Sequence, residues 1–314
     1  MILRGIQFGN VLGASGVQGF FGEGYWFHPL WRPFGLNFDG MTFVSKTVTL
    51  LAKEGNMPLT EQYTPRELVP KCIKVHPLSG IVLNAVGLSN PGLGEALNTK
   101  KWQSLKKPFW ISIMPIQSTK EGRLEEIRLF KEEFIKCKEY FSAPFGLQVN
   151  ISCPNVGIKP MNDAGEAIAF LDILTVLKVP IMLKYSIASA SCDMVLALND
   201  HPGLDAICVS NSIPFGWQGI GKHVWKKNVS PLASLGGGGL SGKALRPLVC
   251  RWISRIRDAG FTKPINGGGG ILCTNDVRHY NSAGASSIFL GSVATLRPWR
   301  VAKIIKLANK IDWI

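Results

Sequence analysis

Short apolar segments rich in β-branched residues alternate along this chain with longer segments whose apolar positions recur with a helical period. The short segments predict eight strands, at 10–15, 42–46, 109–114, 146–151, 180–184, 205–210, 264–268 and 287–291. The longer segments predict helices at 123–138, 163–177, 191–200, 243–259, 274–283 and 298–309. Strands that alternate with helices in this way are typical of a parallel sheet covered by helices.

Eight strands with helical crossovers over roughly 300 residues predict an α/β fold of the (β/α)8 TIM-barrel type. The alternative is a doubly wound open sheet, which favours GxGxxG after the first strand, whereas this chain has GASGVQG at 13–19. Two segments, 47–108 and 212–242, exceed ordinary loop length and in a barrel would elaborate its catalytic face. No linker, repeat or low-complexity segment interrupts the pattern, so we expect a single domain, 1–314.

The composition adds a strong positive charge to this picture. The formal net charge is +14, with 46% hydrophobic and 18% charged residues, which suits a globular protein with a sizeable core. Such a charge is compatible with nucleic acid, an anionic membrane surface or anionic small molecules. Because the basic residues are scattered, with no run of five or more, we interpret the charge as a generally basic surface.

The cysteines and the N-terminus indicate the compartment. The seven cysteines are odd in number and contain no CxxC pair, which argues against a disulfide framework or a zinc site and for a reducing environment. The N-terminal MILRGIQFGN has no apolar signal-peptide core, and no apolar run of about 18 residues follows. We therefore expect a cytoplasmic protein without a bound metal or a membrane span.

Polar residues stand where the predicted strands end. They are Ser15, Lys46, Ser112, Asn150, Lys184, Asn211, the glycines 267–270, and Gly291 with Ser292. Asparagine and lysine are poor strand residues, and burying them inside a barrel is unfavourable unless they are paired. A single case could be a satisfied polar group of the core. Because the carboxyl ends of barrel strands meet on one face, the repeated pattern predicts a ligand site there.

Two glycine-rich segments end the last two strands, PINGGGGI at 264–271 and FLGSV at 289–293. The last two βα loops of such barrels commonly bind a phosphate through backbone N–H groups. Glycine could instead serve only the tight turns. A third run, 236–247, could close over the same group. We expect the phosphate to belong to a cofactor, and Lys184 would place a cation beside a heterocycle such as a flavin.

One cysteine stands apart from the others. If GLQVNI is a strand, Asn150 and Ser152 face the same side, and Cys153 begins the following loop before Pro154. A thiol with an ordinary pKa near 8.5 can remove a proton near neutral pH if its surroundings help slightly. The alternative is a buried, inert thiol, which is how we interpret the cysteines at 72, 137, 208 and 250.

The order of several motifs resembles a known family. These are SKT (45–47), EGNMPL (54–59), NAVGLSNPG (84–92), NISCPN (150–155), MLK (182–184), SNS (210–212), GGLSG (238–242), NGGGGI (266–271) and LGS (290–292). Together they resemble the dihydroorotate dehydrogenases over nearly the whole chain. NISCPN and NAVGLSN are specific to that family, whereas other barrels that bind FMN share the glycine motifs. Cysteine in NISCPN resembles the soluble class 1 enzymes.

The resemblance implies an FMN-dependent barrel that oxidises (S)-dihydroorotate to orotate in pyrimidine (UMP) biosynthesis. It implies that Cys153 is the base that removes the proton from C5 of dihydroorotate, while the hydride at C6 passes to N5 of the flavin. It also implies that Lys46 lies close to both substrate and flavin. The implied substrate-binding residues are Lys46, Asn84, Val86, Gly87, Leu88, Asn150, Asn155, Asn211 and Ser212. The implied FMN-binding residues are Ala14, Ser15, Gly16, Lys46, Thr47, Asn150, Lys184, Ser210, Gly242, Gly269, Gly270, Gly291 and Ser292.

The resemblance leaves the partner and the electron acceptor open. The aromatic segment 14–38 and the loop 212–242 resemble the NAD-linked type, which works with an iron–sulfur/FAD subunit, while the fumarate-linked type is a homodimer. Rival interpretations are a tRNA dihydrouridine synthase, the related module of dihydropyrimidine dehydrogenase, and a non-catalytic binding barrel. The first would need an RNA-binding helical domain after the last strand, and the third would leave the polar strand ends unexplained. We expect a homodimer, with or without an iron–sulfur/FAD electron-transfer subunit, and no nucleic-acid or membrane partner.

Overall fold

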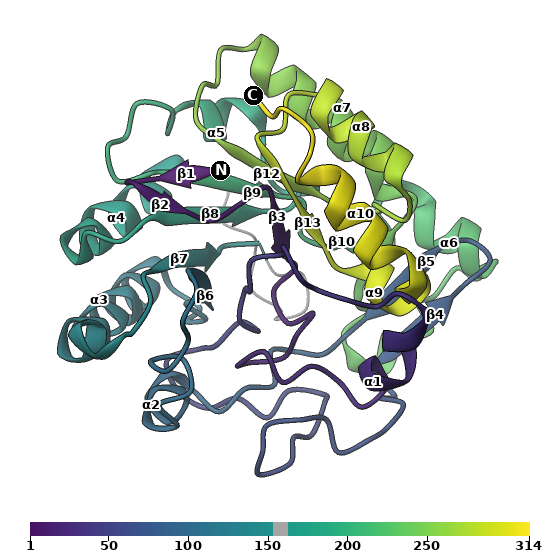
Figure 1. Cartoon of the computed structure of the whole chain (residues 1–314), viewed down its shortest axis with the longest axis horizontal. Coiled ribbons are helices and arrows are strands. Elements are labelled where there is room, and N and C mark those ends of the chain that lie inside the picture. Colours follow the sequence, from purple (N-terminus) through teal and green to yellow (C-terminus); the bar gives the residue numbers. More distant parts are fainter. Residues whose placement is uncertain (153–162) are drawn as a thin grey trace.

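Seven parallel strands form the central sheet (Figure 1). The computed structural model describes residues 1–152 and 163–314. The strands are β3 (Val11–Gly13), β6 (Phe109–Ile113), β7 (Phe145–Asn150), β8 (Ile181–Tyr185), β9 (Ala206–Val209), β12 (Ile265–Gly268) and β13 (Ser287–Leu290). Their order in the sheet is β3-β13-β12-β9-β8-β7-β6, so each of these seven predicted strands is present within a residue or two of its expected position.

Residues 42–48 close the sheet into a barrel by joining its two edge strands. The N–H of Thr42 donates to the carbonyl of Val11 in β3 at 2.8 Å, and the N–H of Trp110 in β6 donates to the carbonyl of Phe43 at 3.0 Å. The strand predicted at 42–46 is nevertheless irregular, with isolated bridges only. Ser45 and Val48 donate to carbonyls two residues apart on β6, so one residue is extra, as in a β-bulge. The architecture is the predicted (β/α)8 barrel with an irregular second strand.

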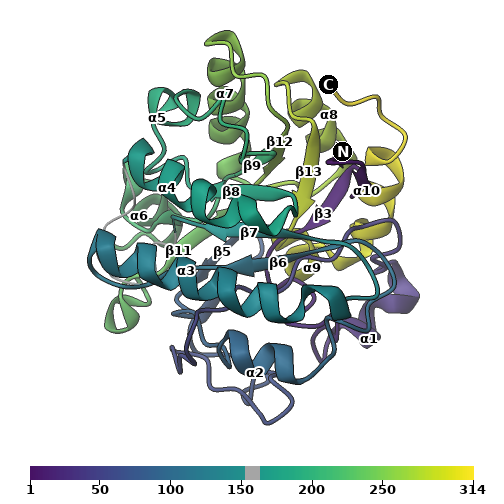
Figure 2. The same cartoon turned by 90° about the vertical axis from the view of Figure 1, so that its left-hand side faces the viewer.

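Helices cover the outside of the sheet (Figures 1 and 2). The six predicted ones are α3 (Lys120–Cys137), α4 (Ala164–Leu174), α5 (Cys192–Leu196), α7 (Leu245–Asp258), α8 (Thr274–Ser282) and α10 (Val301–Ala308). The sequence did not predict α1 (His28–Trp31), α2 (Leu93–Asn98), α6 (Ile220–Trp225) or α9 (Ser292–Leu296). Short 3-10 helices lie at Arg32–Phe34, Lys138–Tyr140, Thr175–Leu177, Trp217–Gly219, Ala233–Leu235 and Pro298–Arg300. In α3, Thr119 caps the N-terminus, and Ile127, Phe130 and Phe134 form the buried face.

A hairpin and apolar side chains fill the amino-terminal end of the barrel. The hairpin consists of β1 (Ile2–Leu3) and β2 (Ile6–Gln7). Leu3 and Phe8 belong to the interior cluster with Trp110 of β6 and Phe289 of β13. The rings of Phe8 and Trp110 lie 4.5 Å apart between centroids. Because this end is packed, a ligand site can open only at the opposite, carboxyl end of the strands.

The two long segments 47–108 and 212–242 contain structure that the sequence did not predict. They supply β4 (Ile73–His76), β5 (Ile81–Asn84), β10 (Ile213–Pro214) and β11 (Gly239–Gly242), which pair antiparallel in the order β10-β11-β5-β4. Leu83 and Leu240 on one face of this sheet are completely buried. Val82 and Asn84 on the other face line a cavity. The two segments therefore form one additional sheet against the carboxyl face of the barrel.

Candidate active site at the carboxyl ends of the barrel strands

A cavity of about 540 Å³ opens where the barrel strands end. Most of the predicted site residues line it, and they come from strand ends far apart in the sequence. They are Ala14, Ser15, Gly16, Lys46, Thr47, Asn84, Val86, Gly87, Leu88, Asn150, Lys184, Ser210, Asn211, Ser212, Gly269, Gly270, Gly291 and Ser292. The fold thus brings these residues together, while their individual roles remain predictions.

Of the predicted residues that the structure describes, Gly242 is not in that lining. Gly242 lies directly behind it, because a Cβ added at Gly270 would stand 2.5 Å from the carbonyl oxygen of Gly242. Cys153 and Asn155 lie outside the described residues. Asn150 and Ser152, which precede them, are described and nearly fully buried.

Two asparagines from strands on either side of β8 are hydrogen-bonded at the cavity wall. The amide nitrogen of Asn211, after β9, donates to Oδ1 of Asn150 at the end of β7, at 3.0 Å. The hydroxyl of Ser152 donates to the carbonyl oxygen of Lys184 in β8 at 3.1 Å. The bond from Asn211 and a longer one from the N–H of Ser152, at 3.4 Å, hold Oδ1 of Asn150, which is 3% exposed. A planar ligand with alternating N–H and C=O groups would meet side chains that both donate and accept.

Lys46 brings a desolvated amine to the cavity. Its Nζ donates to the carbonyl oxygen of Ser89 and stands 4.6 Å from the centroid of the Phe20 ring. Burial lowers the pKa of Lys46 to about 7, although the nearby Cys72 and Glu23 act in the opposite direction. A lysine in this state is stabilised when an anion binds beside it, because the anion favours the charged form.

Gly16 leaves space for the aliphatic part of the Lys46 side chain. Its φ is +86°, and an added Cβ would lie 3.2 Å from Cγ of Lys46. Beside it, the hydroxyl of Ser15 donates to the carbonyl of Ser45 at 2.9 Å and bonds to the hydroxyl of Thr47 at 2.9 Å. Thr47 in turn bonds to the buried Ser112 hydroxyl at 2.8 Å. This chain of hydroxyls fixes the side chains of Ser15 and Thr47.

The turns after β12 and β13 form a backbone cradle. Gly269 and Gly270 have φ of +121° and +76°, which side-chain-bearing residues rarely adopt. At Gly291, an added Cβ would lie 2.9 Å from Cβ of Ala14. Among the described residues, no carbonyl or side chain accepts a hydrogen bond from the N–H of Gly270. Bare backbone with an uncommitted N–H suits an anionic group such as a phosphate.

The loop after β5 has a similar arrangement. Gly87 and Leu88 have φ of +70° and +60° and line the cavity. The carbonyl of Val86 accepts hydrogen bonds from the N–H of Asn56 at 2.8 Å and the hydroxyl of Ser89 at 3.1 Å. Since C=O and the next N–H point in opposite directions in a trans peptide, the N–H of Gly87 points away from Asn56. The sequence did not predict this role for Asn56, although EGNMPL was one of the motifs.

The family follows from comparison with known proteins. A family model described as "Dihydroorotate dehydrogenase" matches residues 3–311. The chain belongs to this family. Dihydroorotate dehydrogenases are flavin-dependent oxidoreductases of pyrimidine biosynthesis, so the predicted family is confirmed.

Two relatives illustrate the similarity to class 1 enzymes. The chain is 28% identical over 313 residues to "Dihydroorotate dehydrogenase B (NAD(+)), catalytic subunit" of Latilactobacillus sakei subsp. sakei (strain 23K), with 97% of this chain and 90% of the relative covered. It is 29% identical over 298 residues to "Dihydroorotate dehydrogenase A (fumarate)" of Lactobacillus delbrueckii subsp. bulgaricus (strain ATCC BAA-365 / Lb-18), with 92% and 85% covered. The two names give different electron acceptors, and the chain is almost equally similar to both.

This member of the dihydroorotate dehydrogenase family has an aromatic cavity wall that the motifs did not indicate. Tyr25, Trp26, Phe27 and His28 line the cavity. The hydroxyl of Tyr25 donates to the carbonyl of Gly16 at 2.6 Å, which ties this segment to the strand ends. Burial lowers the pKa of His28 to about 4, so its imidazole is neutral at physiological pH. The high density of aromatic residues at 19–38 was the feature of the sequence that could have indicated this wall.

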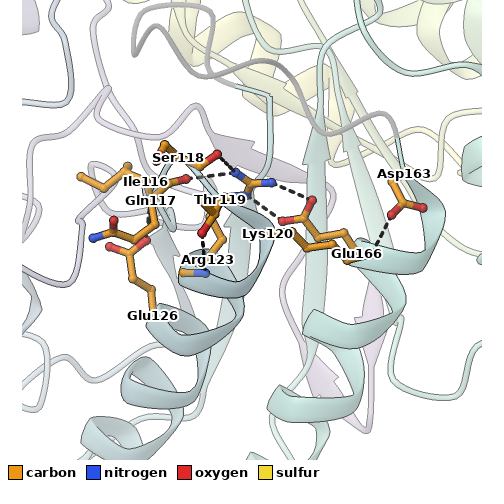
Figure 3. A network of polar contacts seen from close by, with 10 residues as sticks. Ile116, Gln117, Ser118, Thr119, Lys120, Arg123, Glu126, Asp163 and Glu166 are labelled. Carbon is orange, nitrogen blue, oxygen red and sulfur yellow. Dashed lines mark hydrogen bonds and ion pairs between the residues drawn. The ribbon is translucent and has the colours of Figure 1, made fainter.

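A polar network holds the starts of α3 and α4 together (Figure 3). Arg123 donates to both carboxylate oxygens of Glu166, at 2.7 and 3.0 Å. Lys120 bonds to Asp163 at 2.8 Å, and Asp163 caps α4 by accepting from the N–H of Gly165. Figure 3 shows both basic side chains reaching from α3 toward α4. The second described range begins at Asp163, so the network holds the start of that range against α3.

Four other cysteines of this dehydrogenase have raised pKa values that make them poor bases near neutral pH. Burial raises the pKa of Cys137 and Cys250 to about 11 and that of Cys208 to about 12. It also raises the pKa of Cys72. Across residues 1–152 and 163–314, no three His, Cys, Asp or Glu side chains group as metal ligands do. No helix of that part is long and apolar enough to cross a membrane.

Proposed function

We propose that this chain oxidises (S)-dihydroorotate to orotate with FMN as its flavin and Cys153 as the general base. The reaction itself follows from membership of the family. The observation that carries the finer proposal is the meeting, in one cavity, of the Asn150–Asn211 pair, the desolvated Lys46 and a glycine cradle.

The FMN assignment is supported by the glycines and polar residues that line the cavity. Gly269, Gly270, Gly291 and Ser292 would take the phosphate, because the three glycines leave the backbone uncovered and no side chain would fit at Gly270. Ala14, Ser15, Gly16, Thr47, Ser210 and Lys184 would line the flavin, with Gly242 behind the phosphate. Bound FMN would supply the hydride acceptor.

The substrate is expected beside the asparagines. Asn84, Asn150, Asn155 and Asn211, with Ser212, would exchange hydrogen bonds with the amide edges of dihydroorotate. The N–H groups of the loop 86–88 and the amine of Lys46 would bind its carboxylate, which would restore the charge of Lys46.

Cys153 would remove the proton from C5. It follows Asn150 by three residues, so a substrate held by Asn150 would lie near it. The described cysteines at 72, 137, 208 and 250 have raised pKa values and cannot easily substitute for it. A positioned base commonly contributes about 10²–10⁴-fold to the rate.

We further propose that the chain acts as one domain in the cytoplasm, as a homodimer with or without an iron–sulfur/FAD electron-transfer subunit. Relatives of the fumarate and NAD types are similar to it to nearly the same extent. Its charge of +14 suits an anionic substrate and cofactor without requiring nucleic acid.

The test is flavin reduction in the absence of oxygen. The purified protein should contain FMN, and its absorbance near the flavin maximum should bleach when dihydroorotate is added. Cys153→Ala should slow bleaching at least about a hundredfold, whereas Cys250→Ala should not. A flavin that dihydroorotate does not bleach would refute the substrate, and a normal rate in Cys153→Ala would refute the base. Repeating the experiment with fumarate, NAD and a quinone as oxidants identifies the acceptor.

A further inference from the structure

Tyr280 of α8 is a buried residue that the proposed mechanism does not use. Its side chain is completely buried, and its hydroxyl donates to the carbonyl oxygen of Gly269 at 2.7 Å. Burial raises its pKa well above the ordinary value, so the hydroxyl stays protonated and remains a donor. The ring occupies space beneath β12, because a Cβ added at Gly267 would lie 2.8 Å from its Cδ1.

The bond from Tyr280 determines the direction of the next N–H. In a trans peptide the carbonyl of one residue and the N–H of the following residue point in opposite directions. Because the Gly269 carbonyl points toward α8, the N–H of Gly270 points away from it. Gly270 lines the cavity, and no group of the described residues accepts its N–H.

A carboxylate on the same helix fixes the rest of this loop. Oδ2 of Asp276 accepts hydrogen bonds from the N–H of Leu272 at 2.8 Å and of Cys273 at 2.9 Å. Its Oδ1 bonds to Arg246 in α7. The loop between β12 and α8 is thus held at Gly269 and at 272–273, and the peptide between Gly269 and Gly270 would otherwise turn easily because both residues are glycine.

We propose that Tyr280 is a positioning residue that aims the N–H of Gly270 at the phosphate of the bound flavin. The inference rests on the proposed function, because it takes FMN as the ligand. A hydroxyl that never touches the ligand thereby controls the affinity for its phosphate. Without the hydroxyl of Tyr280, the peptide between Gly269 and Gly270 can rotate. The charged phosphate then loses the hydrogen bond from the N–H of Gly270.

The experiment compares FMN with riboflavin, which lacks the phosphate. Flavin is removed from the full-length chain, and dissociation constants for both ligands are measured by quenching of flavin fluorescence. Tyr280→Phe should weaken FMN binding at least about tenfold, the scale of one hydrogen bond to a charged group. It should change riboflavin binding less than about twofold, because riboflavin makes no phosphate contact. A change in packing alone would weaken both ligands equally.

Tyr185→Phe is the matched control, because Tyr185 is also buried and its hydroxyl has no partner among the described residues. It should keep the wild-type ratio of the two constants. If Tyr280→Phe does not fold, Asp276→Asn loosens the same loop and should reduce the preference for FMN. The inference about Tyr280 is wrong, while the cofactor proposal stands, if the folded variants keep the wild-type ratio of the two dissociation constants. It is also wrong if Tyr185→Phe loses as much preference for FMN as Tyr280→Phe. A wild type without preference for FMN overturns the cofactor proposal and the inference with it.

Discussion

The ion pair between Arg123 and Glu166 should contribute strongly to stability. Its side chains are 11% and 4% exposed, and both oxygens of Glu166 bond to the guanidinium. Arg123→Met would leave the carboxylate of Glu166 buried without its partner, and breaking such a pair costs about 3–5 kcal/mol. Because the guanidinium keeps some contact with water, we take the lower end, about 3 kcal/mol. For a chain of this size the melting temperature should fall by about 4–5 °C.

The assay is urea and thermal unfolding, followed by circular dichroism, of a double-mutant cycle. Glu166→Gln in the Arg123→Met background removes the buried charge and should recover roughly 2 kcal/mol. Lys120→Met is the control: it removes an ion pair between the same helices, but Lys120 and Asp163 are 43% and 58% exposed, so no measurable change is expected. Equal effects of Arg123→Met and Lys120→Met, or no recovery in the double variant, would refute the reasoning.

Three further predictions concern the cavity. Gly270→Ala should abolish tight FMN binding, measured as flavin content after purification, because the new Cβ would lie 2.5 Å from the carbonyl oxygen of Gly242. Asn211→Ala should lower kcat/KM for dihydroorotate at least about tenfold while flavin content stays normal, because one substrate hydrogen bond and the support of Asn150 are lost. The flavin-free protein should gain stability between pH 7 and 9 relative to Lys46→Met, by at most about 1.4 kcal/mol per pH unit in urea unfolding.

The sign for Lys46 follows from its pKa of about 7 in the folded protein against the ordinary 10.5. Between these values the unfolded chain binds a proton that the folded chain does not, so stability rises with pH. A parallel pH profile for Lys46→Met would contradict this. The control for Gly270→Ala is Gly94→Ala, because nothing lies within 4 Å of the position that the new Cβ would take at Gly94. The Gly94→Ala variant should have a normal flavin content. Normal flavin content in Gly270→Ala, or an unchanged kcat/KM in Asn211→Ala, would contradict the cradle or the substrate site.

The barrel strands could be predicted because each is buried on both faces and therefore appears as a continuous apolar run, such as Phe109–Ile113. The helix at 120–137 was equally clear, since its apolar side chains repeat on one face. The sequence predicted a regular strand at 42–46, whereas the structure has only isolated bridges there. Its apolar pattern is that of a strand, but the N–H of Ser112 bonds to the side chain of Ser45, and a bulge follows.

The additional sheet could not be predicted as a unit. IKVH and IVLN alternate too briefly to give a clear signal, and β5 pairs with β11 across more than 150 residues of chain. A strand whose partner lies so far away is stabilised by contacts that no local window contains. The cavity wall formed by Val82 and Asn84 therefore depends on a long-range pairing.

The sequence by itself determined which groups could reach the site, because every strand of a parallel barrel delivers its last residues to the same face. Asn150, Lys184, Asn211 and the glycines could be identified as site residues without coordinates for that reason. Only the tertiary structure decided what surrounds and orients them. The pKa of Lys46 depends on burial, and the direction of the Gly270 N–H depends on Tyr280. Lys46 is buried by contacts with distant segments such as the loop at Ser89, and the Tyr280 bond requires α8 to pack against the end of β12, so both effects exist only in the folded chain.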